Sequence, residues 1–469
     1  MKARKVSALP ERGLHRLCGA EPQCLEVNSN KERKADTMKT YILRPFDPVE
    51  RQTPRAKSRP ALGPRLGLPV QPTLFIGLDV HSDSIAVGLA PSGSAEVRAY
   101  GVIGGSHDDV LKLLKKLCAA HPGWLLKICY EAGPHGYPLC RCLRAHGYDC
   151  MIVAPSKVPR KPGDRVKTDR RDALQLARLY RAGELCAIYV PDPQDEAIRD
   201  LVRGRFLVCR QQHRARQQLK MFLLRHNIRY TGKTSWNPAH LRYLAQVKMP
   251  FPVQQIVFQE MLDVITEASA RLERLEQEIA RAVPVWRWYP VVQALMSLRG
   301  MALLHAATTI AELGDLNRFT HPSRLMSYLG LVPSEDTTGT DRRQGGITKM
   351  GNGPARRALI EAAWNYRTAP RISPHLRKRQ EGLPKAVLEI SWNAQRRLHH
   401  RFVHLTRVGR KKSQVAVTAV ARELSGFVWA IARLVPPLPP KDTTDPALTP
   451  TSLAAVSSRG SSPRGIRRR

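Results

Sequence analysis

Residues 74–80, Leu74-Phe75-Ile76-Gly77-Leu78-Asp79-Val80, form the first compact apolar run of the chain. A short run of this kind predicts a buried β-strand, here with a carboxylate, Asp79, near its end. Further strands are expected at residues 84–89, 96–103, 125–130 and 148–154. Helices are expected at residues 110–120 and around Cys140 and Leu143. The alternation of strands and helices predicts an α/β layer structure.

Four carboxylates occupy positions that such a fold can bring together. Asp79 and Glu131 each follow an apolar strand, while Asp169 and Asp172 stand three residues apart at the start of an amphipathic helix. Residues three apart on a helix are neighbours, and a hard divalent cation takes oxygen ligands. The four acids therefore predict a site for one or two Mg²⁺ ions. Helix capping by Asp169 and turn formation by the strand-end acids are the structural alternatives.

The chain is strongly basic, with a formal net charge of +37 over 469 residues. This charge predicts a polyanionic partner, because neutralising phosphates releases counterions. A membrane surface is the competing polyanion, but no segment approaches eighteen uninterrupted apolar residues, so no membrane-spanning helix is expected. The nine cysteines have no zinc-site spacing and no signal peptide precedes them, which predicts reduced thiols in a cytoplasmic protein.

Long helices are expected in the middle of the chain. Residues 195–228 are helical in pattern and basic. An apolar a/d seam follows, formed by Met261, Ile265, Ala268, Leu272, Leu275 and Ile279. Such a seam is typical of a coiled coil, and we expect it to join two copies of the chain. A helical hairpin within one chain is the alternative.

The C-terminal region begins near Val291 and is predicted to be mainly helical. The turn at residues 298–301, before a helix at residues 302–313, either presents backbone amides to a phosphate or is a plain helix turn. Residues 334–353 are expected to be a polar, glycine-bearing loop whose amides and cations approach a phosphate backbone. A helix at residues 354–366 and two basic helices within residues 385–434 complete the region.

Both ends of the chain have compositions typical of disorder, rich in Arg, Lys and Pro at the start and in Pro, Ser, Thr and Arg at the end. The expected domains are a basic arm at 1–72, an α/β domain at 73–190, a basic helix with a coiled coil at 195–284, a C-terminal domain at 290–434 and a tail at 436–469. Met38 is an alternative start position within the arm.

Several ordered motifs resemble the DEDD transposases of bacterial insertion sequences, the family that includes the Piv invertase and the bridge-RNA-guided recombinases. They lie at residues 75–81, 130–133, 167–173, 328–335 and 345–352. The resemblance covers roughly residues 73–432. It implies an RNase H-like, RuvC-like N-terminal domain, a coiled-coil insertion and a C-terminal transposase domain.

The resemblance also implies a site and partners. Asp79, Glu131, Asp169 and Asp172 would bind Mg²⁺, and a serine of the C-terminal domain would attack a DNA phosphate to form a covalent intermediate. DNA at the element ends and target is the expected partner, and a structured RNA guides some members. Residues expected to contact nucleic acid are Lys167, Arg170, Arg171, Arg342, Arg343, Thr348, Lys349 and Arg356. The protein would act at the bacterial nucleoid.

The sequence departs from the family where the serine is expected. It reads Asp336-Thr337-Thr338-Gly339, so Thr338 takes the position of the nucleophile, with Thr337 as the alternative. Threonine keeps a hydroxyl, but its methyl group restricts χ1 and crowds the approach to a phosphate. Asp336 adds a negative charge beside that phosphate. We therefore expect weak or absent strand exchange with nucleic-acid binding retained.

Three functions follow from these residues. The leading one is a transposase that transfers DNA strands through a side-chain hydroxyl with Mg²⁺. A RuvC-like nuclease that uses water as nucleophile needs only the four acids. The third is a non-catalytic nucleic-acid-binding remnant of a mobile element.

Overall fold

The computed structural model describes residues 71–159, 168–339 and 341–439. The predicted basic arm lies outside these residues except for positions 71 and 72, and the predicted tail except for positions 436–439. Lys167 also lies outside them.

A five-stranded mixed sheet forms the N-terminal domain, in the order β3-β2-β1-β4-β5. Its strands are β1 (Thr73–Val80), β2 (Ser84–Pro91), β3 (Arg98–Gly104), β4 (Leu125–Glu131) and β5 (Asp149–Val153). β2 runs antiparallel to β1 and β3, whereas β4 is parallel to β1 and to β5. All five predicted strands are confirmed. The sheet and its helices are consistent with the predicted RNase H-like domain.

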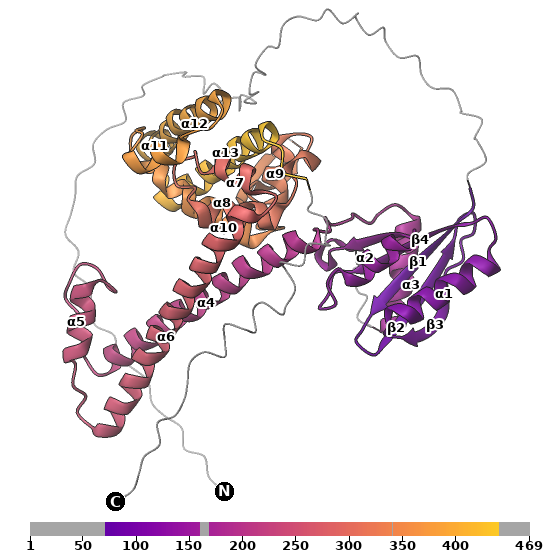
Figure 1. Ribbon diagram of the computed structural model, residues 1–469, viewed down its shortest axis with the longest axis horizontal. Helices are drawn as coiled ribbons and strands as arrows, with labels where there is room; N and C mark the ends of the chain where they lie inside the picture. The colour runs from indigo at the N-terminus through magenta and orange to yellow at the C-terminus, as the bar shows by residue number, and fades with distance from the viewer. Residues whose placement is uncertain (1–70, 160–167, 340, 440–469) are drawn as a thin grey trace, which may run out of the picture. The chain divides into compact units, whose positions relative to one another are not determined.

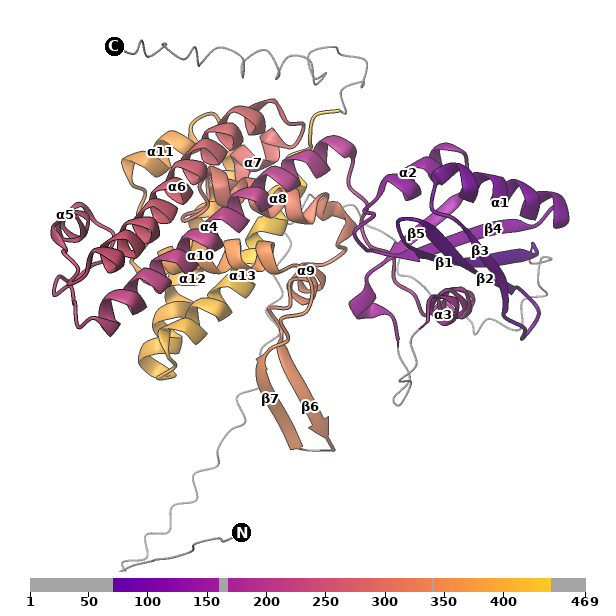
Figure 2. The ribbon, with the colours of Figure 1, turned by 90° about the horizontal axis from the view of Figure 1, so that it is seen from below.

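Helices cover both faces of this sheet (Figure 2). They are α1 (His107–Ala120), α2 (Pro138–Ala145) and α3 (Asp169–Arg181). Leu74, Ile76 and Leu78 alternate along β1 and join the buried cluster with α1 and α2, because side chains two apart on a strand point to one face. The opposite face, which carries Gly77, packs against α3.

Two glycines bring α3 unusually close to the sheet. A Cβ atom added at Gly77 would lie 2.6 Å from the backbone nitrogen of Ala177, and one added at Gly88 would lie 2.6 Å from the backbone carbon of Ala173. Real Cβ atoms essentially never make contacts this short. The absence of a side chain at Gly77 of β1 and at Gly88 of β2 therefore sets the distance between α3 and the sheet.

A helical hairpin follows, made of α4 (Pro193–Arg225) and α6 (Pro252–Ala282), with α5 (Pro238–Gln246) between them. The two long helices lie side by side (Figure 1). They run antiparallel, since Arg205 pairs with Glu276 at 2.6 Å while Gln212, further along α4, bonds to Ser269, earlier on α6.

The predicted seam on α6 packs within the chain. Ile265 is buried in a cluster with residues of α4 and α5, and Ile279 is buried in the C-terminal core beside Val202 of α4. This is the helical-hairpin alternative. Association of two copies through the seam stays a prediction.

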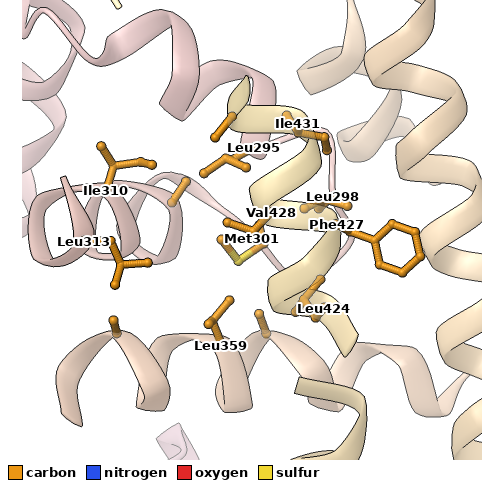
Figure 3. Packing of buried hydrophobic residues seen from close by; sticks show 14 of the residues in the cluster. Leu295, Leu298, Met301, Ile310, Leu313, Leu359, Leu424, Phe427, Val428 and Ile431 are labelled. Carbon is orange, nitrogen blue, oxygen red and sulfur yellow. The ribbon is translucent and has the colours of Figure 1, made fainter. Parts of the chain in front are cut away.

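The C-terminal domain is a helical bundle around one large apolar core. Its helices are α7 (Tyr289–Leu295), α8 (Leu303–Leu313), α9 (Pro322–Tyr328), α10 (Gly353–Ala363), α11 (Pro374–Gln380), α12 (Lys385–Val403) and α13 (Ser413–Leu434). Figure 3 shows Leu424, Val428 and Ile431 of α13 among the side chains that fill this core. α13 is long and apolar enough to cross a membrane, and its packing in the core accounts for that composition. The prediction of a basic helix is wrong for α13, which is mostly apolar.

The predicted polar loop at 334–353 is largely a β-hairpin. β6 (Pro333–Thr338) and β7 (Asp341–Ile347) pair antiparallel, and Gly339 has a φ of +60° at the turn. Figure 2 shows both strands extending away from α9, and nearly all of their residues are exposed. A strand with both faces in solvent needs no apolar alternation, which is why the pattern did not predict it.

The close packing of α3 predicts the effect of a single methyl group. We expect Gly88→Ala to lower the free energy of unfolding by about 1–3 kcal/mol, because the helix or the strand must shift. Urea denaturation followed by circular dichroism measures the change. The matched control is Gly204→Ala on α4, where an added Cβ meets nothing within 4 Å. That change should stabilise by about 0.5–1 kcal/mol through helix propensity. Equal effects of the two variants would contradict the packing argument.

Candidate active site

Two of the predicted acids lie at neighbouring strand ends. Asp79 is the penultimate residue of β1, and Glu131 is the last residue of β4. The two strands are parallel, and Leu78 pairs with Tyr130 in register, so Asp79 and Glu131 follow at the same edge of the sheet. The side chain of Asp79 is only 21% exposed.

The other two acids stand in the first turn of α3. Thr168 is the N-cap, and its side-chain oxygen accepts a hydrogen bond from the backbone N–H of Arg171 at 3.3 Å. The alternative in which Asp169 caps the helix is therefore wrong. Asp169 and Asp172 are the first and fourth residues of the helix that Thr168 caps.

His81 joins these carboxylates, a role that the sequence did not suggest. Its Nε2 atom lies 3.5 Å from Asp79 Oδ2 and 3.6 Å from Asp169 Oδ1. One ligand atom from each of these three residues lies within 4.8 Å of the others. A turn directs the imidazole there, with the backbone N–H of His81 donating to the carbonyl of Ser84 at 3.0 Å. The sequence signals were its position two residues after Asp79 and its place at the end of the motif at residues 75–81.

The electrostatics of the cluster suit a cation. Burial raises the pKa of Asp79, and the charges of Asp172 and Asp169 raise it further, while His81 acts in the opposite direction. Asp172 is thus close enough to Asp79 to influence it, although it is not one of the three convergent ligand residues. Binding a cation at a site where negative charges are close together is favourable, because it relieves their repulsion. Carboxylate oxygens with an imidazole nitrogen fit a divalent metal ion.

Three cations are expected to contact phosphate beside these acids. Arg170 and Arg171 are exposed in the first turn of α3, where a phosphate could approach. Lys167 lies outside the described residues. Arg170 and Arg171 stay predictions as phosphate contacts.

The hairpin divides its polar side chains between two faces. Thr337 faces Arg342 across the strands, and Glu335 faces Gln344. Glu335 accepts from Arg342 at 3.0 and 3.1 Å, from Gln344 at 3.2 Å and from the hydroxyl of Thr337 at 3.0 Å. These bonds lower the pKa of the Glu335 carboxyl. Arg342 and Thr337 are therefore both hydrogen-bonded to Glu335. Contact of Arg342 with nucleic acid and the role of Thr337 as the alternative nucleophile stay predictions.

Thr338 occupies the other face, at the tip. It pairs with Asp341, and Asp336 pairs with Arg343. Because side chains alternate along a strand, Asp336, Thr338, Asp341 and Arg343 share this face. The proposed nucleophile position thus has two carboxylates and one guanidinium around it.

The segment after the hairpin is tied down by its own backbone and by Arg356. The backbone N–H of Thr348 donates to Val332 at 2.9 Å, and that of Lys349 donates to Gly330 at 3.1 Å. Arg356 donates to the carbonyl of Leu329 at 2.9 Å. These contacts give Arg356 a structural role. Contact of Thr348, Lys349 and Arg356 with nucleic acid stays a prediction.

Asn352 is a further residue that the sequence analysis did not single out. Its side-chain oxygen accepts from the backbone N–H of Ala355 at 2.9 Å and so caps α10. Its amide nitrogen donates to Glu312 at 2.7 Å, and Glu312 also accepts from Arg203. The motif at 345–352 therefore ends on a residue that joins α10 to α8 and α4.

Known proteins match the chain over most of these elements. A family model for DEDD transposases of the IS110 type, described as Transposase, matches residues 76–228. The model of the Transposase IS116/IS110/IS902 family matches residues 292–380. The chain is 46% identical over 360 residues to "Putative transposase y4qE" of Sinorhizobium fredii, which covers 76% of this chain and 88% of that protein. It is 31% identical over 344 residues to the transposase for insertion sequence element IS1533 of Leptospira borgpetersenii, covering 71% of this chain and 96% of that protein.

Because the pKa of Asp79 is raised, removing its charge should increase the stability of the folded protein, and the increase should depend on pH. The folded protein binds this proton more tightly than the unfolded chain, so stability is lost as pH rises through the raised pKa. In metal-free buffer we expect Asp79→Asn to raise the melting temperature at pH 8, and the gain to shrink toward pH 4.5. Differential scanning fluorimetry in EDTA measures both. Asp83→Asn, an exposed aspartate near the same turn, is the control. If the rise in melting temperature caused by Asp79→Asn were larger at acid pH than at pH 8, the predicted direction of the pH dependence would be wrong.

Proposed function

The chain belongs to the DEDD transposases of the IS116/IS110/IS902 family, and on that premise we propose that it cleaves insertion-sequence DNA at a divalent metal centre formed by Asp79, Glu131, Asp169 and Asp172. The convergence of Asp79, His81 and Asp169 within 4.8 Å is the observation that carries the proposal. The acid at the end of β1 and the acid at the start of α3 are ninety residues apart in sequence, so only the fold brings them together.

Mg²⁺ is the proposed cofactor. When bound, it would neutralise phosphate charge and polarise the bond that breaks. Asp79 and Asp169 would supply oxygen ligands, with Asp172 and Glu131 completing the acidic edge. His81 would supply an imidazole nitrogen beside these carboxylates. Arg170 and Arg171, in the first turn of α3, would contact the phosphates of the strand.

The hydroxyl of Thr338 is the proposed nucleophile for strand transfer, and its surroundings make it a poor one. Asp336 and Asp341 share its face of the hairpin, so an approaching phosphate meets two negative charges. Arg343 offsets one of them. This arrangement also supports the second candidate function, a nuclease in which water replaces the side-chain hydroxyl at the same carboxylates.

The partners follow from the proposed chemistry. DNA at the element ends and at the target is the substrate, and the net charge of +37 supports strong binding of a polyanion. A guide RNA and assembly of several copies through α6 are further parts of the proposal. We place the activity at the bacterial nucleoid in the cytoplasm.

The metal centre is tested by removing one charge. Asp169→Asn should lower DNA cleavage by at least about a hundredfold, as for other groups that stabilise transition-state charge. Binding to the same DNA should be unchanged or slightly tighter. Gel-based cleavage and fluorescence anisotropy measure the two effects. Asp263→Asn, an exposed aspartate on α6, is the matched control and should cleave normally. If Asp169→Asn cleaved DNA as fast as the native protein, the proposed metal centre would be wrong.

The nucleophile is tested by covalent trapping. Labelled element-end DNA is incubated with protein and Mg²⁺ and then denatured, and protein-linked DNA is counted. We expect little adduct with the native protein and more with Thr338→Ser, because loss of the methyl group opens the approach to the phosphate. Thr337→Ser, on the opposite face of the hairpin, is the control and should not increase the adduct. An adduct that Thr337→Ser increases and Thr338→Ser does not would assign the nucleophile to Thr337. Cleavage without adduct in every variant would favour water.

A further inference from the structure

A cationic cavity lies in the C-terminal domain, formed by residues that the proposed mechanism does not use. It has a volume of about 660 Å³ and is lined by the turn before α8 and the start of that helix, by Asn365, and by α11 with the segment that leads into it. The charged and titratable side chains around it are Arg299, Arg371, Lys378, Arg379, His305 and His375. Within the part of the chain that the structure describes, no acidic residue lines it. A volume of this size is ordinary for a ligand site.

The turn that carries Arg299 is fixed by the core. Leu298 and Met301 are fully buried and point among the helices of the bundle (Figure 3). Gly300 has a φ of +82°, and a Cβ atom there would lie 2.7 Å from the amide nitrogen of Asn365. The turn therefore presents Arg299 at the cavity from a rigid support.

Backbone oxygens hold two of the guanidinium groups in place. Arg299 donates to the carbonyl of Ala369 at 2.8 Å and to that of Thr368 at 3.2 Å, and also bonds to the Thr368 hydroxyl. Arg379 donates to the carbonyl of Met301 at 3.0 Å. Carbonyl groups orient a guanidinium but do not neutralise it. The positive charges of Arg299 and Arg379 therefore remain available to an anion.

The remaining cations add to this excess of charge. Arg371 and Lys378 are exposed, and neither forms a salt bridge with any residue that the structure describes. Burial lowers the pKa of Arg299, and the neighbouring charge of Arg371 lowers it further. Close, partly buried like charges cost folding free energy. Such an arrangement is typical of a site that binds an anion.

A buried tyrosine lies in the core of the same domain. The side chain of Tyr366 is fully buried, and its hydroxyl has no hydrogen-bond partner among the described residues. The charges of both Arg299 and Arg379 influence its pKa, which places the ring near them. Tyr366 does not line the cavity, and its buried ring packs in the core of the domain that supports the cationic residues.

We propose that this cavity binds a phosphate group of the nucleic-acid backbone, held by Arg299, Arg371, Lys378 and Arg379. The inference rests on the proposed function only for the identity of the polyanion. A phosphate alone is smaller than the cavity, so the sugar and the neighbouring nucleotide would share the space. DNA and RNA present the same phosphate chemistry, and the experiment separates them.

The test compares the salt dependence of binding in two double variants of the full chain. Arg371→Gln with Lys378→Gln removes two exposed charges of the cavity. Lys411→Gln with Lys412→Gln removes two exposed charges before α13 and is the matched control. Fluorescence anisotropy measures affinity for a short labelled DNA duplex, and for RNA of the same sequence, between about 50 and 200 mM salt.

We expect the cavity variant to reduce the slope of log affinity against log salt by about 2 and to weaken binding on the order of tenfold per lost charge. The control should change both much less. A loss confined to DNA or to RNA identifies the strand that the cavity holds. If the cavity variant behaves like the control while the native protein binds tightly, the site is wrong and the proposed function stands. If the native protein binds neither DNA nor RNA, the phosphate site and the proposed function are both wrong.

Discussion

The close approach of α3 to the sheet is the constraint on which the carboxylate centre depends. β1 and β2 expose backbone rather than side chains at Gly77 and Gly88, and the helix backbone fills that space. Only at this distance can the first turn of α3 bring Asp169 within reach of His81 and Asp79. The same closeness crowds negative charge, which raises the pKa of Asp79. The packing that builds the site thus also destabilises it until a cation binds, as is common where function requires like charges to converge.

Two buried polar networks secure α4 to the C-terminal domain. Asp195, near the start of α4, is buried and accepts from Trp286 at 2.8 Å and from Arg287 at 3.0 Å. Two turns further on, Arg203 pairs with the buried Glu312, and Asn352 completes that network. A buried charge left unpaired costs several kcal/mol, so these pairings fix which face of α4 meets the bundle. Burial of Glu312 works against its ionisation, but its hydrogen bonds with Arg203 and Asn352 outweigh this and lower its pKa.

The parts of the fold that sequence could predict are those that bury apolar side chains. The five strands and the amphipathic helices follow from such patterns, and they place Asp79 at a strand end and Asp169 at a helix start, which the fold brings together. The β-hairpin of β6 and β7 could not be predicted, because its strands bury almost no side chains and therefore show no alternation of apolar and polar residues. The seam on α6 indicated an apolar partner, which we expected a second copy of the chain to supply, whereas Ile265 and Ile279 of the seam are buried within the chain. A seam pattern does not specify which helix packs against it. His81 was missed because its role comes from a turn that folds back on β1, a relation that spacing along the chain does not express.

The distribution of charge separates binding from chemistry in this protein. Affinity for a polyanion depends on the total excess of cations, which is large and spread over the chain. Strand transfer depends instead on the few charges within a Debye length of the attacking hydroxyl. At the hairpin tip Asp336 and Asp341 outnumber Arg343, so the local field opposes a phosphate even though the protein as a whole attracts one. A change at Thr338 alters steric access but leaves that field in place. Efficient transfer through this hairpin therefore also requires cations brought from outside it, by the metal centre, by another part of the chain or by a second copy.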